Sequence, residues 1–139
     1  MIFTPSSEFY SMLYNEGLID NSFGAYYTGK KTYGHSLVVG QSNNPEKIRE
    51  KIVELLNKPS EEVLKVQDFE RLKKKNLGGF LMGFNSIEFI ANNFIDLYFD
   101  NFNLLDYLDV LENIEFDDVL IRYKEHFTTD SMVLSIIRP

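Results

Sequence analysis

The sequence contains no cysteine and no tryptophan, and histidine occurs only twice in its 139 residues. The absence of cysteine excludes disulfides, thiolate metal sites and a cysteine nucleophile, and it fits a reducing cytoplasm. A catalytic zinc site needs at least three protein ligands and a general base, whereas His35 and His126 lie in separate segments. The chain alone therefore cannot be a zinc hydrolase, and we assign no catalytic, cofactor-binding or metal-binding residue.

Positive charge and long apolar runs are also scarce. The 14 Lys and Arg residues are outnumbered by 21 Asp and Glu, and the formal net charge of -7 repels phosphate backbones. The one basic cluster, Lys73 to Lys75, has acidic neighbours. No stretch approaches the roughly 20 apolar residues that span a bilayer, and the start lacks a signal-peptide pattern. We expect a soluble, cytoplasmic chain without nucleic acid or membrane as a partner.

The remaining composition is typical of a folded protein. The chain is 44% hydrophobic and 25% charged, and its 12 Phe and 8 Tyr residues indicate a large core. At this length, one domain over residues 1–139 is expected.

The residue patterns predict an α+β domain in the order helix, two strands, several helices, strand. Ser6 and Ser7 offer an N-cap for a first helix that Gly17 would end. The β-rich runs 23–28 and 32–39, joined by residues 29–31, predict a hairpin. Helices are expected from Pro45, from Ser60 through Phe84, from Ile87, from Leu104 and from Phe116. A buried strand over residues 132–137 would complete a small sheet with helices on one face, a two-layer arrangement.

Neither histidine is assigned a catalytic or metal-binding role. The segment Arg122 to His126 matches the inverted zincin pattern His-x-x-Glu-His except at its first ligand, where an arginine cannot bind a metal because it stays protonated. We interpret His126 as the end of an amphipathic helix, near the negative end of the helix dipole. His35 falls on the apolar and aromatic face of its strand, and we expect a hydrogen-bonded core or cross-strand residue.

The other candidate motifs have structural interpretations. Ser6, Ser7 and Ser36 lack the Gly-x-Ser-x-Gly elbow of a nucleophile, and the pair Gly78 and Gly79 lacks the ending of a phosphate loop. A solvated helix start is preferred to a calcium or acid–base site for the carboxylates Glu112, Glu115, Asp117 and Asp118. Core packing is preferred to a partner-binding groove for the aromatic residues Phe89, Phe94, Tyr98, Phe99 and Phe102.

The order of several motifs resembles one protein family. A Ser-Ser helix with a Gly-Leu turn spans residues 6–18, and the hairpin and an Asn-Pro-Glu helix start at residues 44–46 follow it. Further matching segments lie at residues 79–92, 106–112 and 115–119, and the last strand ends at Arg138 and Pro139. Over nearly the whole chain, this arrangement resembles the C-terminal domain of insulinase/pitrilysin-type (inverzincin) zinc peptidases, in a bacterial, processing-peptidase-like branch.

The resemblance implies a LuxS/mitochondrial-processing-peptidase-like metallohydrolase fold, with a small mixed sheet covered by helices. Two such halves enclose a peptide-holding chamber, and the zinc motif lies in the N-terminal half of the family's chains. We therefore expect a fragment of a longer chain, with zinc only in the N-terminal half of the parent. The implied partners are that zinc-binding half and a peptide substrate in the parent. The family fold places a further strand before the first helix, and a sheet without it has an unpaired edge, so we also expect a homo-oligomer.

Two positions depart from the family pattern. Active members carry an Arg four residues before the Gly-Leu pair and a Tyr three residues after its Gly, and both assist substrate carbonyl binding. The corresponding residues here are Leu13 and Asp20. The alternative interpretation is that Leu13 packs in the core and Asp20 caps the turn.

Three functions follow from these observations. The first is a non-catalytic C-terminal domain that completes the peptide-holding chamber of a zinc-dependent peptidase-family protein. The alternative is a self-standing protein–protein interaction module that uses the aromatic helices. A third is a small-ligand or metal site built from the surplus carboxylates.

Overall fold

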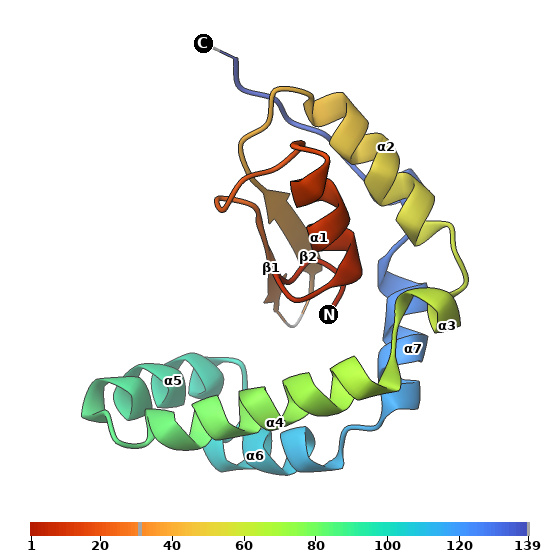
Figure 1. The fold of residues 1–139 in the computed structure, drawn as a ribbon. Helices are drawn as coiled ribbons and strands as arrows, with labels where there is room; N and C mark the ends of the chain where they lie inside the picture. The colour runs from red at the N-terminus through yellow and green to blue at the C-terminus, as the bar shows by residue number, and fades with distance from the viewer. Residues whose placement is uncertain (31, 139) are drawn as a thin grey trace.

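The structure is a computed structural model that describes residues 1–30 and 32–138. Lys31, in the predicted hairpin connection, and Pro139, at the end of the predicted last strand, lie outside the described residues. The elements are α1 (Glu8–Asn15), β1 (Gly24–Gly29), β2 (Gly34–Val39), α2 (Pro45–Leu56), α3 (Ser60–Val63), α4 (Val66–Gly83), α5 (Ile87–Phe99), α6 (Leu104–Asn113), α7 (Phe116–His126) and the short 3-10 helix η1 (Thr129–Ser131). The predicted α+β class is confirmed (Figure 1).

Helix α1 begins and ends as predicted. The Ser7 hydroxyl accepts a hydrogen bond from the Tyr10 amide at 3.1 Å and so caps the first turn. Gly17 has a φ of 67°, which permits the Leu18 amide to donate to the Leu13 carbonyl at 3.0 Å. This turn reverses the chain and brings residues 18–23 back along α1.

Strands β1 and β2 form the predicted hairpin. They pair antiparallel, with Tyr26 opposite Leu37 and Tyr27 opposite Ser36. The sheet of the described residues has these two strands only, so it is antiparallel and not mixed as predicted. The core contacts the face that carries Val38, while Tyr26 and Leu37 on the other face are 65% and 54% exposed.

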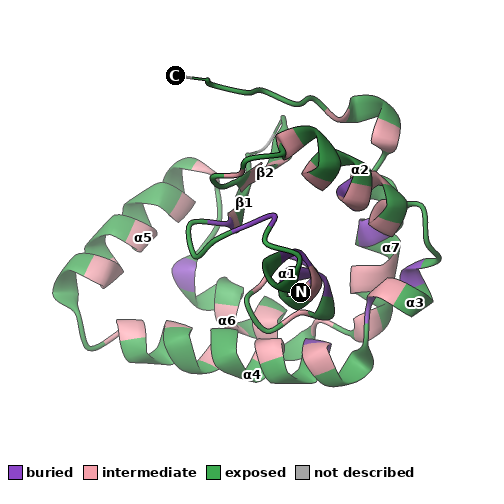
Figure 2. Ribbon diagram, turned by 45° about the horizontal axis from the view of Figure 1, so that its top comes forward, coloured by how far each residue is buried: buried purple, intermediate pink, exposed green. Residues whose placement is uncertain are grey.

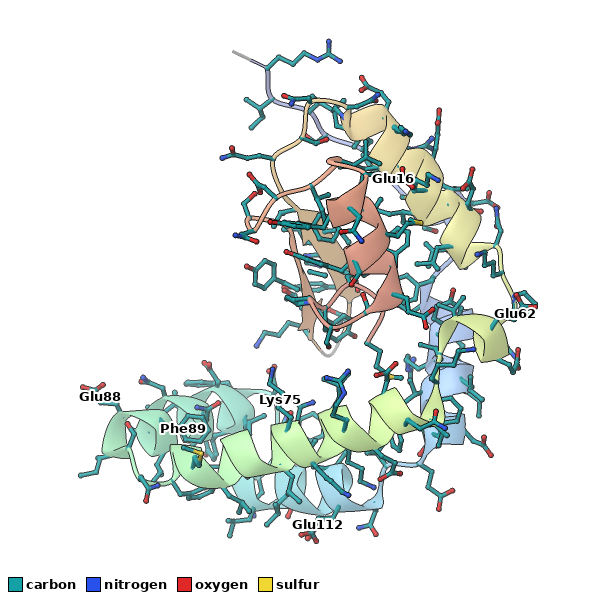
Figure 3. The ribbon with its side chains drawn as sticks, in the orientation of Figure 1. Glu16, Glu62, Lys75, Glu88, Phe89 and Glu112 are labelled. Carbon is teal, nitrogen blue, oxygen red and sulfur yellow. The ribbon has the colours of Figure 1, made fainter. Side chains whose placement is uncertain are left out.

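The core lies around α1. Leu13 is fully buried at its centre, and Tyr123 brings α7 against it. Figure 2 shows buried residues gathered near α1 and mostly exposed residues elsewhere. Glu16, labelled in Figure 3, faces α2, where it pairs with Lys47 at 3.7 Å and with Lys51 at 3.6 Å.

The predicted long helix from Ser60 is wrong, because the chain breaks between α3 and α4. Leu64 has an extended backbone and is 4% exposed. Burial of this side chain in the core requires the chain to leave the helix there and begin α4 in a new direction. Gly78 and Gly79 lie within α4 without ending it.

Helices α4, α5 and α6 form an arm that leads away from α3 and α7 and passes below α1 and the hairpin in the view of Figure 1. An aromatic cluster holds the arm together, with Phe80 5.1 Å from Tyr107 and 6.1 Å from Phe89 between ring centroids. Gly83 makes room for this cluster, because a Cβ there would lie 2.5 Å from the Phe89 ring. Figure 3 shows Phe89 on the inner side of α5, beside α4.

The predicted last strand is also wrong. In the part of the chain that the structure describes, residues 132–137 form no strand, and Val133 and Ile137 are 89% and 97% exposed. The segment runs past α2 (Figure 1), and Arg138 pairs with Glu46 at 2.6 Å. A strand needs a neighbouring strand for its backbone hydrogen bonds, and the hairpin does not extend to this segment.

Candidate functional site

A cavity of about 700 Å³ lies between the hairpin and α7. Its walls come from three elements distant in the sequence: the N-terminal segment 1–4, the inner hairpin face and α7. The N-terminal segment contributes Ile2 and Phe3, both buried against the core. The lining is thus mainly apolar, with a small set of polar groups, which is the usual composition of a binding site.

The polar groups centre on Ser36 and His126. The Ser36 hydroxyl oxygen lies 2.9 Å from His126 Nε2, although 90 positions separate the two residues in the sequence. The Tyr27 ring meets the imidazole edge-on, with 5.4 Å between ring centroids. His126 is in the last turn of α7, as predicted, near the negative end of the helix dipole.

This pair lacks the organisation of a serine nucleophile. A catalytic imidazole is oriented by a third group on its other ring nitrogen. Among the described residues, no carboxylate hydrogen-bonds to His126: Glu125 pairs with Arg122 at 3.0 Å, and Asp118 accepts from the Glu115 amide at 2.9 Å. The arrangement is suited to hydrogen bonding with a bound group, not to nucleophilic attack.

The carboxylates do not gather into a metal site either. Within residues 1–30 and 32–138, no group of three or more His, Asp or Glu side chains is placed to hold a metal ion. Asp118 and Glu115 instead form the solvated start of α7, as the sequence predicts. The Arg122 guanidinium, at the position of the missing zincin ligand, is engaged with Glu125.

Leu13 and Asp20 take the structural roles of the alternative interpretation. Leu13 is 0% exposed in the core and is not among the residues that line the cavity beside α7. The Asp20 carboxylate accepts hydrogen bonds from the Ser22 amide at 2.8 Å and from the Ser22 hydroxyl at 2.5 Å. These hydrogen bonds from Ser22 hold the pKa of Asp20 below its usual range and fix the turn before β1.

Two predictions of burial are wrong. His35 is a cross-strand residue opposite Thr28, but it is exposed and stacks on Tyr33, with 6.3 Å between ring centroids, because its face of β2 is turned away from the core. Most of the aromatic stretch is exposed as well, and Phe99 and Phe102 are 78% and 66% exposed. The sequence pattern identifies an apolar face but does not show which element covers it.

The sequence analysis missed the Ser36–His126 pair. The only signal was that Ser36 shares a strand face with Gly34 and Gly40, which have no side chains and so leave space for another segment above the sheet. A helix end that enters this space could not be identified from a residue 90 positions away.

The chain is similar to part of a bacterial protein that is named as a zinc protease. It is 31% identical over 138 residues to the protein called uncharacterized zinc protease YmfH from Bacillus subtilis (strain 168). The match covers 99% of this chain and 32% of that protein, so the chain spans about a third of the length of this curated relative. The similarity confirms the resemblance found in the sequence, to the C-terminal part of a pitrilysin-type zinc protease. No protein-family model and no solved structure matches the chain.

None of the helices in the described ranges combines the length and the apolar character that a bilayer crossing requires.

Proposed function

We propose that the chain is the non-catalytic C-terminal domain of a zinc-dependent peptidase-family protein and completes its peptide-holding chamber. The observation that carries this proposal is the similarity along 99% of the chain to a protein named as a zinc protease, of which it matches 32%. Such a match is what one domain of a longer peptidase chain would give.

The cavity supports a binding role in this chamber. Its apolar walls can bury side chains of an extended peptide, while Ser36, His126 and Tyr27 offer hydroxyl and imidazole groups to its backbone. The zinc ion and its general base would come from the N-terminal half of the parent, with the peptide held between the two halves in the cytoplasm.

Cleavage by the parent is expected to be slow. Neither Leu13 nor Asp20 can supply the hydrogen-bond donors that the resemblance assigns to these positions in active members. Loss of one such donor costs about 3 to 4 kcal/mol of transition-state stabilisation, a rate reduction of roughly a hundred- to a thousand-fold.

The test compares the full-length protein with a version that ends before this domain. Cleavage of unstructured peptides is measured with zinc, after chelation, and with an upstream zinc-ligand variant as the control. We expect zinc-dependent cleavage by the full-length protein, and its loss in the shortened version and in the 139-residue chain alone. Equal cleavage by the shortened version, or cleavage by the chain alone, would contradict the proposal.

The second candidate is a self-standing protein–protein interaction module. The observation that favours it is the exposure of the arm's aromatic residues, including Tyr98 at 66% and Phe99 at 78%. Mass spectrometry of the native protein distinguishes the two, because an independent module would be produced as the 139-residue chain and the proposed domain as part of a longer one.

A further inference from the structure

Helix α5 is apolar on two sides. Its inner side, with Phe89, Ile90 and Leu97, is partly buried within the arm. On an adjoining side Ile87, Phe94, Ile95 and Tyr98 are 85%, 52%, 51% and 66% exposed. These four residues occur at i, i+7, i+8 and i+11, which places them on one helix face. We call them the outer α5 face.

The outer α5 face has the properties of a protein contact. A helix that is apolar on most of its circumference is normally buried on most of it, because each exposed apolar side chain forgoes the free energy of leaving water. Phe94 and Tyr98 are already stacked, with 6.2 Å between centroids and 15° between ring planes. The exposed Phe99, which is the last residue of α5 and whose ring centroid lies 6.1 Å from that of Tyr98, and the exposed Phe102 add apolar surface at this end of the helix.

No part of the described chain covers this face. The hairpin contacts the arm through a polar pair at its tip, where Lys30 lies 2.9 Å from Asp100. Figure 2 shows α5 at the edge of the molecule with exposed residues along it, and Figure 3 shows Glu88 at the start of α5, pointing away from the arm.

We propose that the outer α5 face docks against the remainder of the longer protein. The inference rests on the proposed function, because about two thirds of the matched zinc protease lies outside the region that resembles this chain. The surface fits an apolar groove with a basic rim, since acidic Glu88 borders it. A second copy fits poorly, because each copy has a net charge of -7 and would present the same acidic border.

The test uses single cysteines, which suit a chain without cysteine of its own. Phe94→Cys and its control Asn92→Cys are made in the full-length protein; Asn92 is exposed on the polar side of the same helix turn. The rate of maleimide labelling is measured in buffer and in denaturant, with the labelled peptide identified by mass spectrometry. We expect at least about tenfold protection of Phe94→Cys in buffer relative to Asn92→Cys. Ile87→Cys and Asp96→Cys form a second pair should the first variant not fold, because Asp96 is exposed on the same polar side of α5 as Asn92.

Equal labelling of both members in each pair would overturn the proposal. Protection that disappears on dilution would also overturn it, because a second copy would then cover the face. Zinc-dependent peptide cleavage by the unsubstituted full-length protein is measured separately and tests the proposed function. A cleaving protein with an unprotected face refutes the docking surface alone, whereas absence of cleavage with a protected face refutes the peptidase role alone.

Discussion

Substitution of Leu13 tests two statements: that this side chain is buried in the core, and that its position corresponds to the substrate-binding Arg of active family members. Leu13 is fully buried, so Leu13→Ala leaves a cavity at the centre of the core. Such substitutions cost about 2 to 5 kcal/mol, and we expect about 3 kcal/mol here because the surrounding rings of Phe9 and Tyr10 cannot collapse into the gap. At roughly 3 to 5 °C per kcal/mol for a chain of this size, the Tm should fall by about 10 to 15 °C.

Urea denaturation followed by tyrosine fluorescence measures this effect, since the chain has 8 Tyr and no Trp. Asn15→Ala is the matched control in the same helix. Asn15 is exposed, so its replacement should change the free energy of unfolding by less than about 0.5 kcal/mol. Equal effects of the two substitutions would refute the burial argument.

Leu13→Arg separates the core from the chamber interpretation. A guanidinium in place of Leu13 would be buried without a partner, at a cost of several kcal/mol, comparable to the roughly 5 to 15 kcal/mol that stabilises a domain. We expect an unfolded or aggregated chain. A folded Leu13→Arg variant whose full-length form cleaves peptides about tenfold faster, a gain of roughly 1.4 kcal/mol, would show instead that position 13 faces the chamber.

Four further outcomes are expected. Gly83→Ala should lower the free energy of unfolding by about 1 to 3 kcal/mol, because the Cβ of the alanine would lie 2.5 Å from the Phe89 ring. An unchanged midpoint in urea titrations would contradict the packing of the arm. A double-mutant cycle of Ser36→Ala and His126→Ala should give a coupling free energy of about 0.5 to 1.5 kcal/mol across their 2.9 Å contact, and additive effects would contradict this. Burial raises the pKa of Tyr123 above its ordinary value, so the unfolded chain loses the phenol proton at a lower pH than the folded chain does. The free energy of unfolding should therefore decline as the pH rises above about 10, and Tyr123→Phe should weaken that decline. Identical pH profiles of the variant and the unsubstituted chain would contradict this. Elemental analysis of the dialysed 139-residue chain should find no stoichiometric zinc, and retention with submicromolar affinity would refute this.

Local signals account for the elements that were predicted correctly. Ser7 and Gly17 bound α1, and Asn44 accepts from the Lys47 amide at 3.2 Å to start α2. Capping hydrogen bonds and the positive φ of a glycine involve residues only a few positions apart, so a short stretch of sequence is enough to predict where such a helix begins or ends. The family resemblance depended on the same local motifs and their order along the chain.

The errors concern segments whose conformation depends on distant residues. Residues 132–137 have the composition of a strand, but a strand forms only where another strand offers hydrogen bonds. The helix expected from Ser60 breaks at Leu64 because the side chain of this residue is buried in the core. His35 was placed on the correct strand face, but which face the helices cover is decided by the packing of the whole domain.

The sequence by itself therefore determined the α+β class, the ends of the first helices, the hairpin, and the absence of cysteine chemistry, because each depends on residue type or short-range spacing. Only the tertiary structure decided that Leu13 lies in the core, that Ser36 meets His126 beside a cavity, and that one face of α5 stays exposed. Each of these depends on which apolar surfaces cover one another, and burial of apolar area is non-directional. Hydrophobic patterns in the sequence identify the apolar surfaces that are stabilised by burial, whereas the packing of the folded chain decides which element buries each of them.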